Sequence, residues 1–396
     1  MVPSQSNVRP WALLVAVVAL APCAALAQTP LGTPTAAFPE DFGTIQTIRE
    51  LPDGRVLVAD PLSNALYAVD FDAGTRVVIG REGEGPEEYM QPDAVWPLPD
   101  GSSLLVDLGN ARLTTLDANL EFIETMPIAS GDPRPGGGSP LVLALPRGVD
   151  AEGNIYAQAM SMGFGGAMPD SGAVLRINRR TQDIDTVARF KMEERRRSES
   201  GGANNRNVQI SPIPLSTQDA WGVAADGSVV LARAGDYHID WVSPDGSVRS
   251  GPPQPFESVR IGTAEKEEYV AGQGRMGGGV GIRVEINNDE MQMTFSRGGG
   301  AGGPREIDSY DWPARKPPVY SGRLSVDLLN RVWVRKHVDA GEPSTYDVFD
   351  DTGALEGTFT LENGKRIIGF GNGAVYVVAY DEFDLNYLER YALPAT

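Results

Sequence analysis

The chain has 396 residues, of which 41 % are hydrophobic, so it can bury a large core in one or two domains. Its formal net charge is −19 at pH 7, and a surface this acidic makes nucleic acids and anionic membranes poor partners. The 46 glycines and 30 prolines fall short of a disordered composition and suit a turn-rich all-β protein.

The first 27 residues are predicted to be a secretory signal peptide. Arg9 precedes the apolar run WALLVAVVALAPCAALA, and the small residues ALA at 25–27 form a cleavage signal. A lipid anchor at Cys23 is the less favoured alternative, because Pro22 stands directly before this cysteine. Cleavage after residue 27 removes Cys23, the only cysteine, and Arg9, so the mature chain has no thiol and a charge of −20. We expect an exported protein, periplasmic or extracellular, without a transmembrane segment.

An internal repeat begins at residue 51. LPDGRVLVAD at 51–60 is echoed by LPDGSSLLVD at 98–107. Each copy has a Pro-Asp-Gly turn followed by alternating apolar residues, which predicts a hairpin and a strand. Gly54 can adopt the positive φ that such a turn requires. With the stretches before and after it, each copy predicts four antiparallel strands, here called A to D.

The pattern recurs six times along the chain. The turn between strands A and B is marked at each copy by one residue, namely Gly54, Gly101, Gly153, Gly227, Asn330 and Gly373. Six four-stranded units of this kind predict a six-bladed β-propeller, a single domain over 28–396. The sixth unit lacks a fourth strand. Residues 33–43 are predicted to supply it and to close the ring; the alternative is that 28–40 form a disordered leader.

Several motifs resemble the NHL-like six-bladed β-propellers of exported bacterial proteins. They are GREGEGPEEYMQPDAV at 80–95, RVWV at 331–334, YDVFDDTGALEG at 346–357 and DEFDLNYLERYAL at 381–393. The resemblance covers about residues 40–396 and implies the fold. It implies little about activity, because much of that family has no known function.

The long connections all belong to two classes. Three join strand D of one blade to strand A of the next, at about 127–147, 191–219 and 262–321, and two smaller ones join strands B and C of blades three and five. In a propeller these two classes emerge on the same rim, which we call the long-loop face. Because function tends to lie on loops above a rigid scaffold, this face is the predicted recognition surface; tolerated drift in loop length is the alternative.

Polar and aromatic residues near these connections are the candidate ligand-binding residues: Asp60, Asn64, Arg81, Glu84, Glu88, Tyr89, Asp107, Asn110, Arg112, Trp312, Arg335, His337 and Asp381. Asp60 and Asp107 occupy equivalent positions. This favours a repeated structural role, in which each accepts backbone N–H groups of the B–C turn. A Ca²⁺ ion held in the central channel by carboxylates and carbonyls is the alternative.

Two glycine-rich or basic stretches are interpreted as flexible loops. GQGRMG at 272–277 matches the spacing of a dinucleotide-binding loop, but it lacks the strand before it and the helix after it that such a loop needs. The run RRR at 195–197 could attract an anionic partner, and a solvated mobile loop is the favoured interpretation.

The mature chain has two histidines and no zinc-binding spacing. Asp236, His238 and Asp240 alternate on an outer strand, which favours a solvated face. His337 begins a B–C loop on the long-loop face and is the better catalytic candidate, although no residue is assigned to catalysis.

The tryptophans of the mature chain fall into two groups, those on strands and one in an insertion. Trp96, Trp221 and Trp333 lie on inner or second strands, which favours packing between blades. Trp312 lies in the insertion at 262–321 and is a candidate for ligand stacking.

Two functions are consistent with these features. The favoured one is a monomeric binding scaffold that recognises a protein, peptide or glycan on the long-loop face, without a cofactor. The alternative is a metal-assisted hydrolase or lactonase-like enzyme with Ca²⁺ at the channel mouth, which would need convergent carboxylates there. Fold alone does not choose between them.

Overall fold

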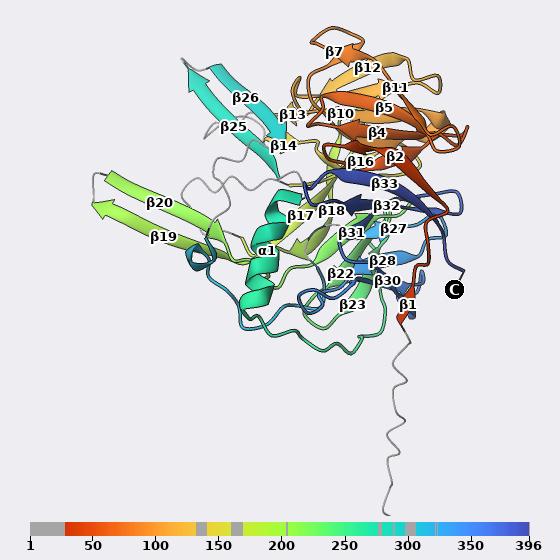
Figure 1. Ribbon diagram of the computed structural model, residues 1–396. Helices are drawn as coiled ribbons and strands as arrows, with labels where there is room; N and C mark the ends of the chain where they lie inside the picture. The colour runs from red at the N-terminus through yellow and green to blue at the C-terminus, as the bar shows by residue number, and fades with distance from the viewer. Residues whose placement is uncertain are drawn as a thin grey trace, which may run out of the picture.

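A computed structural model describes residues 28–131, 141–159, 169–202, 205–275, 279–287, 290–297, 306–320, 322 and 324–395. The predicted signal peptide and most of the B–C connection of blade three lie outside these residues. The described part is mostly β, and its large sheets are arranged as the six blades of a propeller (Figure 1). Within it, no helix has the length and apolar character needed to cross a bilayer.

Blades one to three are four-stranded antiparallel sheets whose strands follow chain order. Blade one contains β3 (Ile48–Glu50), β4 (Val56–Asp60), β5 (Ala65–Asp70) and β6 (Thr75–Val78). Blade two contains β9 (Pro92–Pro97), β10 (Ser103–Asp107), β11 (Arg112–Leu116) and β12 (Phe122–Pro127), with the short 3₁₀ turn η1 (Pro99–Gly101). Blade three contains β15 (Pro146–Val149), β16 (Ile155–Gln158), β17 (Ser171–Ile177) and β18 (Ile184–Lys191).

Blades four to six continue the pattern, and the last two also take strands from the N-terminal segment. Blade four contains β21 (Ala220–Val223), β22 (Val229–Arg233), β23 (His238–Val242) and β24 (Val248–Ser250). Blade five contains β27 (Ser325–Val326), β28 (Val332–Arg335), β29 (Ser344–Phe349), β30 (Leu355–Leu361) and β1 (Gln28–Pro30). Blade six contains β31 (Lys365–Gly371), β32 (Ala374–Tyr380), β33 (Asn386–Ala392) and β2 (Ala36–Phe42).

The six predicted turn residues between strands A and B all have positive φ. The φ values are 88° at Gly54, and 83°, 82°, 82°, 60° and 67° at Gly101, Gly153, Gly227, Asn330 and Gly373 in turn. The left-handed region is open to glycine and is tolerated by asparagine, so one backbone geometry explains all six positions.

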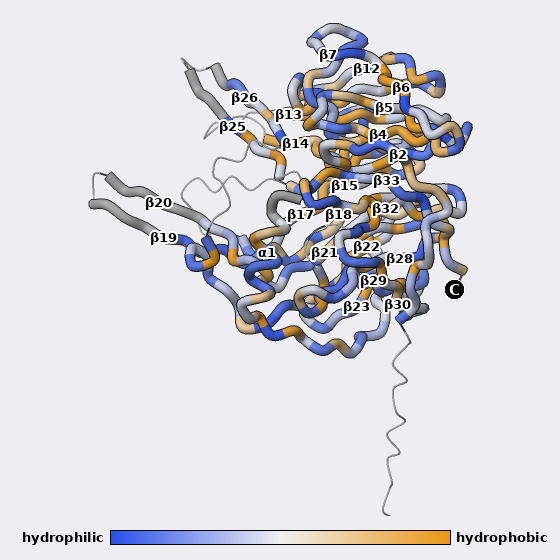
Figure 2. Tube along the Cα trace, in the orientation of Figure 1, coloured by the Kyte–Doolittle hydropathy of each residue, from blue (hydrophilic) through white to orange (hydrophobic). Residues whose placement is uncertain are grey.

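The core is divided into six apolar clusters, one between each pair of neighbouring blades. One of them joins Leu57 and Leu66 of blade one to Leu105 and Leu116 of blade two. The same arrangement repeats around the ring, with sheets largely apolar and turns largely polar (Figure 2). Trp221 and Trp333 are 0 % and 2 % exposed within two of these clusters, which confirms that they pack between blades.

The N-terminal segment forms two edge strands. β2 pairs antiparallel with β33, in the position of the missing fourth strand of blade six. Phe38 and Phe42 of β2 are buried in the cluster that blade six shares with blade one. β1 pairs in parallel with β30 at the edge of blade five, which the sequence pattern did not predict.

The insertions form regular structure. α1 (Thr263–Arg275), the hairpin of β19 (Arg195–Gly202) and β20 (Asn205–Pro212), and the hairpin of β25 (Val280–Asn287) and β26 (Glu290–Arg297) project from the same side of the propeller, on the left of Figure 1. The shorter pairs are β7 (Arg81–Glu82) with β8 (Glu88–Tyr89) and β13 (Ala129–Ser130) with β14 (Val142–Leu143), and a 3₁₀ turn, η2, spans Ile307–Ser309.

Two interpretations of loops were therefore wrong. The run at 195–197 is the beginning of a β-strand, whose backbone pairs from Arg195 with Pro212 to Gly202 with Asn205. Its polar residues carry no apolar alternation, so the pattern did not reveal the strand. The first four residues of GQGRMG belong to α1, because helical hydrogen bonding continues through two glycines to Arg275. The rest of that motif lies outside the described residues.

Candidate functional site

Asp60 and Asp107 are fixed by their own turns. Asp60 is 1 % exposed and accepts hydrogen bonds from the backbone nitrogens of Gly43, Thr44, Leu62 and Ser63. These bonds tie the entry to strand A to the B–C turn, as the favoured structural interpretation predicted.

Asp107 repeats this arrangement in blade two, where it is fully buried. It accepts from the backbone nitrogens of Met90, Gln91 and Asn110. Its other oxygen accepts from the Asn110 side chain at 2.7 Å and lies 3.5 Å from Arg112 Nε. Both carboxylates are therefore occupied by donors of the protein itself.

The candidates on the first D–A connection and beside it are also engaged with one another. Glu88 accepts from Arg81 Nε and Gly85 N, and Arg112 donates to the carbonyl oxygens of Gly85 and Glu88. Asn110 Nδ2 donates to the Gly83 carbonyl as well as to Asp107. These bonds shape the loop around β7 and β8.

Four further candidates have local roles or exposed side chains. Tyr89 is 1 % exposed, and its hydroxyl accepts from Leu66 N. Asp381 accepts from Phe383 N and Leu385 N in the B–C turn of blade six. Asn64 adopts φ 48° in the B–C turn of blade one, and Glu84 is exposed.

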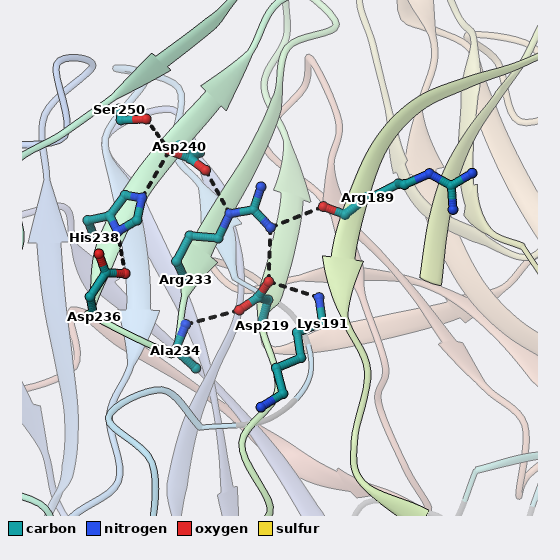
Figure 3. A network of polar contacts seen from close by, with 9 residues as sticks. All are labelled: Arg189, Lys191, Asp219, Arg233, Ala234, Asp236, His238, Asp240 and Ser250. Carbon is teal, nitrogen blue, oxygen red and sulfur yellow. Dashed lines mark hydrogen bonds and ion pairs between the residues drawn. The ribbon is translucent and has the colours of Figure 1, made fainter. Parts of the chain in front are cut away.

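A partly buried polar network in blade four explains the alternation of Asp236, His238 and Asp240 (Figure 3). The two ring nitrogens of His238 lie 2.8 Å from Asp236 Oδ1 and 3.1 Å from Asp240 Oδ1. Asp240 also accepts from Arg233 Nε at 2.7 Å, and Arg233 binds Asp219 at 2.9 Å.

The expected solvated face holds for Asp236, whose side chain is 64 % exposed, but not for Asp240, which is 6 % exposed. Burial opposes ionisation of Asp240, but hydrogen bonds from Ser250 and Arg233 outweigh it and lower its pKa. Asp219 holds the network to the chain around it, because it accepts from Lys191 N and Ala234 N.

No cluster suited to a metal ion is found in the described part of the chain. There, no group of three or more His, Cys, Asp or Glu side chains lies in an arrangement that could hold one. Asp60 and Asp107, two carboxylates on the long-loop face, accept hydrogen bonds from backbone N–H groups.

A cavity of about 610 Å³ lies on the long-loop face, and we call it the α1 cavity. Its walls come from α1, from the segment 316–320, from the end of strand B and the B–C loop of blade five, and from the start of blade six. Two of the candidates, Arg335 and His337, line it. Residues from 46 to 380 in the sequence meet there, so only the closed ring assembles it.

α1 is held over this site by two glutamates. Glu265 Oε1 accepts from Ala340 N at 3.2 Å, while its Oε2 accepts from Gly262 N at 2.9 Å and caps the helix. These backbone bonds, that from Gly262 first, lower the pKa of Glu265. Glu268 accepts from Gly341 N at 3.4 Å. The helix is thereby attached to the B–C loop of blade five.

An aromatic cluster supports the outer side of α1. Tyr269 lies with its ring centroid 5.5 Å from that of Trp312 and 6.0 Å from that of Tyr310. Trp312 also donates its Nε1–H to the Ile307 carbonyl. The structure thus places Trp312 behind a cavity-lining tyrosine, where it positions the helix, and its role in ligand stacking stays a prediction.

Two arginines of the α1 cavity have no carboxylate within ion-pair distance among the described residues. Arg335 lies over the Tyr320 ring, 4.1 Å from its centroid, and donates to Ser344 Oγ at 3.3 Å. Arg366 donates to the Ile45 carbonyl at 2.6 Å and to the Tyr380 hydroxyl. Both guanidinium groups are oriented by neutral partners, and neither forms an ion pair with a carboxylate in the described part of the chain.

Lys316 and His337 are buried beside them. Lys316 is 4 % exposed and donates to the Val338 carbonyl at 2.7 Å, and burial lowers its pKa. His337 is 9 % exposed, and its Nε2 has no hydrogen-bond partner among the residues that the structure describes. Burial, followed by the positive charges of Lys316 and Arg335, lowers the pKa of His337 to about 3, so its imidazole is neutral at pH 7.

Sequence reasoning missed most of the cavity wall. Lys316, Tyr320, Lys365, Arg366 and Tyr380 were not among the candidates, yet they line it together with Arg335 and His337. A signal was present, because three basic pairs, Arg315-Lys316, Arg335-Lys336 and Lys365-Arg366, interrupt an acidic chain at connections of one rim.

No family model and no curated protein matches this chain. Among solved structures it is similar to a protein from Bacteroides fragilis described as exported, with 13 % identity over 94 % of this chain and 95 % of that one, at a TM-score of 0.45. Virginiamycin B lyase from Staphylococcus aureus is 10 % identical over 91 % of this chain and 99 % of its own, with a TM-score of 0.38. A gluconolactonase from Xanthomonas campestris is 9 % identical over 92 % of this chain and 97 % of its own, with a TM-score of 0.40.

Similarity at this level carries no conclusion about ligand or activity. Membership in the NHL-like group accordingly stays a prediction. The functional argument rests on the residues of the α1 cavity.

Proposed function

We propose that this protein is an exported binding protein that holds a protein, peptide or glycan ligand on its long-loop face, with the α1 cavity as the ligand site. The α1 cavity itself carries this proposal. Its volume of about 610 Å³ falls in the range typical of ligand sites, roughly 300–1,000 Å³. Its floor is the rigid rim of blades five and six, and one wall is a helix from an insertion.

Ligand screening by thermal unfolding tests this proposal. A ligand that binds only the folded protein raises its melting temperature. We expect an oligosaccharide or peptide that raises the melting temperature to slow hydrogen exchange in α1 and in segments 335–344 and 363–366. Protection confined to the A–B turns, on the opposite rim, would contradict the proposed site.

A matched pair of variants sharpens the result. Glu342 is exposed and lines the α1 cavity, so Glu342→Trp narrows its mouth and is expected to weaken binding at least tenfold. Glu356 is exposed on β30 of the same blade and away from the cavity, so Glu356→Trp is expected to leave the affinity unchanged.

The enzymatic alternative remains a metal-assisted hydrolase or lactonase-like enzyme. It is favoured by one observation, the lowered pKa values of His337 and Lys316 in one cavity, since perturbed groups in a cleft are typical of active sites. A melting temperature that rises with Ca²⁺ and falls with a chelator would support it. Equal melting temperatures with Ca²⁺ and with the chelator would contradict the metal-assisted part of this alternative.

Export is tested separately. Protein recovered outside the cytoplasm is expected to begin at Gln28 on N-terminal sequencing. A lipid-modified N-terminus at Cys23 would instead establish the lipoprotein alternative.

A further inference from the structure

We propose that the ligand presents an oxyanion, a carboxylate or a phosphate ester, to Arg335, Arg366 and Lys316 in the α1 cavity. This inference rests on the proposed function for the place of binding and adds the chemical class of the ligand.

The charge of the cavity wall is opposite to that of the molecule. Five lysines and arginines line the α1 cavity against three glutamates, in a chain with a net charge of −19. Two of the glutamates, Glu265 and Glu268, accept backbone N–H bonds that attach α1. A concave positive surface within an acidic protein concentrates anions at that place and repels them elsewhere.

The cations of the wall divide into compensated and uncompensated groups. Lys336 lies 3.2 Å from Asp347, and Lys365 lies 2.9 Å from Glu389, so both charges are balanced by the fold. Arg335 and Arg366 have no such partner among the described residues and contact neutral oxygens and tyrosine rings. The fold keeps two charges in the cavity that it does not itself neutralise.

The arrangement of these arginines suits an oxyanion. Stacking on Tyr320 holds the Arg335 guanidinium by its face, which leaves N–H donors at its edge for an acceptor in the same plane. Burial alone would lower the pKa of Arg335, but the nearby Tyr346, Tyr320 and Tyr380 and the carboxylate of Glu268 more than offset this and raise it. A guanidinium fork binds carboxylate and phosphate oxygens in pairs, and each such bond is strengthened by charge.

Among the described residues, the buried end of the site holds only a long ion pair. Lys316 is nearly fully buried, its nearest carboxylate oxygen, from Glu268, is 3.9 Å away, and its closest bond is to a neutral carbonyl. His337 has an orphaned Nε2 and lies under the positive charges of Lys316 and Arg335. An oxyanion in the cavity offsets these charges, and the neutral imidazole can donate a hydrogen bond to it.

Minimal ions test this inference. Acetate and inorganic phosphate represent the two sources of the oxyanion, and acetamide is the neutral analogue of acetate. The imidazole signals of His337 are followed by NMR at constant ionic strength, and the chain has only one other histidine, His238. A bound anion is expected to shift the His337 signals saturably and to raise their titration midpoint.

Two substitutions locate the ion. Arg335→Gln and Arg366→Gln are each expected to weaken binding at least tenfold. Arg55→Gln removes the same charge from a residue on the opposite rim that is ion-paired with Asp53, and it should have no effect. Unchanged melting temperatures and circular dichroism establish that the variants are folded; for a variant that unfolds, the corresponding Arg→Lys change, which keeps the charge but loses the fork, takes its place.

The outcomes separate the possibilities. A saturable shift with acetate alone assigns a carboxylate, one with phosphate alone assigns a phosphate ester, and either supports the inference. No saturable shift with either ion, equal shifts with acetamide, or shifts that persist in both arginine variants would overturn it. If neither ion binds but a screened ligand still slows hydrogen exchange in α1, the oxyanion inference is wrong and the proposed function stands. If the ligand slows exchange only elsewhere, the proposed function is wrong whatever the ion result.

Discussion

At the scale of single residues, the decisive property is whether a side chain keeps an unpaired charge or an unused hydrogen-bonding group after folding. Asp60 and Asp107 were candidates because they end strands on the long-loop face, and their oxygens are occupied by backbone N–H groups. Arg335 and His337 were candidates for a similar reason, and they retain an uncompensated charge and a free ring nitrogen. The same reasoning from position thus gave structural residues in one blade and cavity residues in another.

Asp107→Ala is expected to lower the free energy of unfolding and to leave the ligand affinity unchanged. The change leaves the N–H groups of Met90 and Gln91 without their acceptor in a buried turn, which costs about 2–3 kcal/mol. Denaturant unfolding measures the loss. Glu84→Ala, at an exposed side chain of the adjoining loop, is the control and should be neutral. A normal stability with lost binding would instead make Asp107 a ligand group.

His337 gives stability a defined dependence on pH. Its pKa is about 3 in the folded protein and about 6.5 when unfolded, because burial, Lys316 and Arg335 disfavour its charged form, while Tyr320 packs against the ring. Between these values the unfolded state binds more protons, so the contribution is complete above pH 6.5 and is lost as the pH falls toward 3.

The His337→Gln variant isolates this contribution. The difference in unfolding free energy between pH 7.5 and pH 5 should be about 2 kcal/mol smaller in the variant than in the wild type. Denaturant unfolding of both proteins at the two pH values measures it. Equal differences would show that the imidazole is not kept neutral by its site.

At the scale of elements, the insertions are structured and docked rather than loose. The hairpin β19–β20 is joined to the segment before blade five by Arg196 and Asp311, at 2.9 Å. The hairpin β25–β26 is joined to blade two, where Arg297 pairs with Asp93 and its backbone nitrogen donates to Gln91 at 2.8 Å. These contacts join each insertion to another part of the protein.

α1 depends on polar contacts more than on an apolar face. The double variant Glu265→Ala with Glu268→Ala removes the bonds to Ala340 and Gly341, so hydrogen exchange in α1 is expected to accelerate about tenfold or more, with little change in melting temperature. Glu267→Ala, at an exposed position of the same helix, is the matched control. Unchanged exchange in the double variant would show that the cluster of Tyr269, Tyr310 and Trp312 alone holds the helix.

At the scale of the whole molecule, an apolar cluster of described residues lies at each interface between neighbouring blades. The cluster between blades six and one contains Phe38 and Phe42 from the N-terminal strand together with Tyr376 and Val378 from the last blade. We propose that this strand is what closes the propeller, because it pairs with β33 and fills the last interface between blades.

Phe42→Ala tests that closure. Phe42 is 1 % exposed, and removal of a buried phenylalanine costs about 3–5 kcal/mol. Denaturant unfolding should show this loss. Phe383→Ala changes the same residue type at a position that is 75 % exposed on the same blade, and it should be neutral. Equal stabilities for the two variants would contradict closure by the N-terminal strand.

The sequence by itself determined the six blades and their turns. Strand alternation and positive-φ turn residues are local properties, so Gly54, Gly101, Gly153, Gly227, Asn330 and Gly373 could be read directly from the chain. The side on which the long connections lie followed from strand order alone. The tertiary structure decided the α1 cavity and its charge, because Gln46, Lys316, Arg335 and Arg366 approach one another only when the first and last blades meet, and because compensation of a charge depends on neighbours in space rather than in sequence.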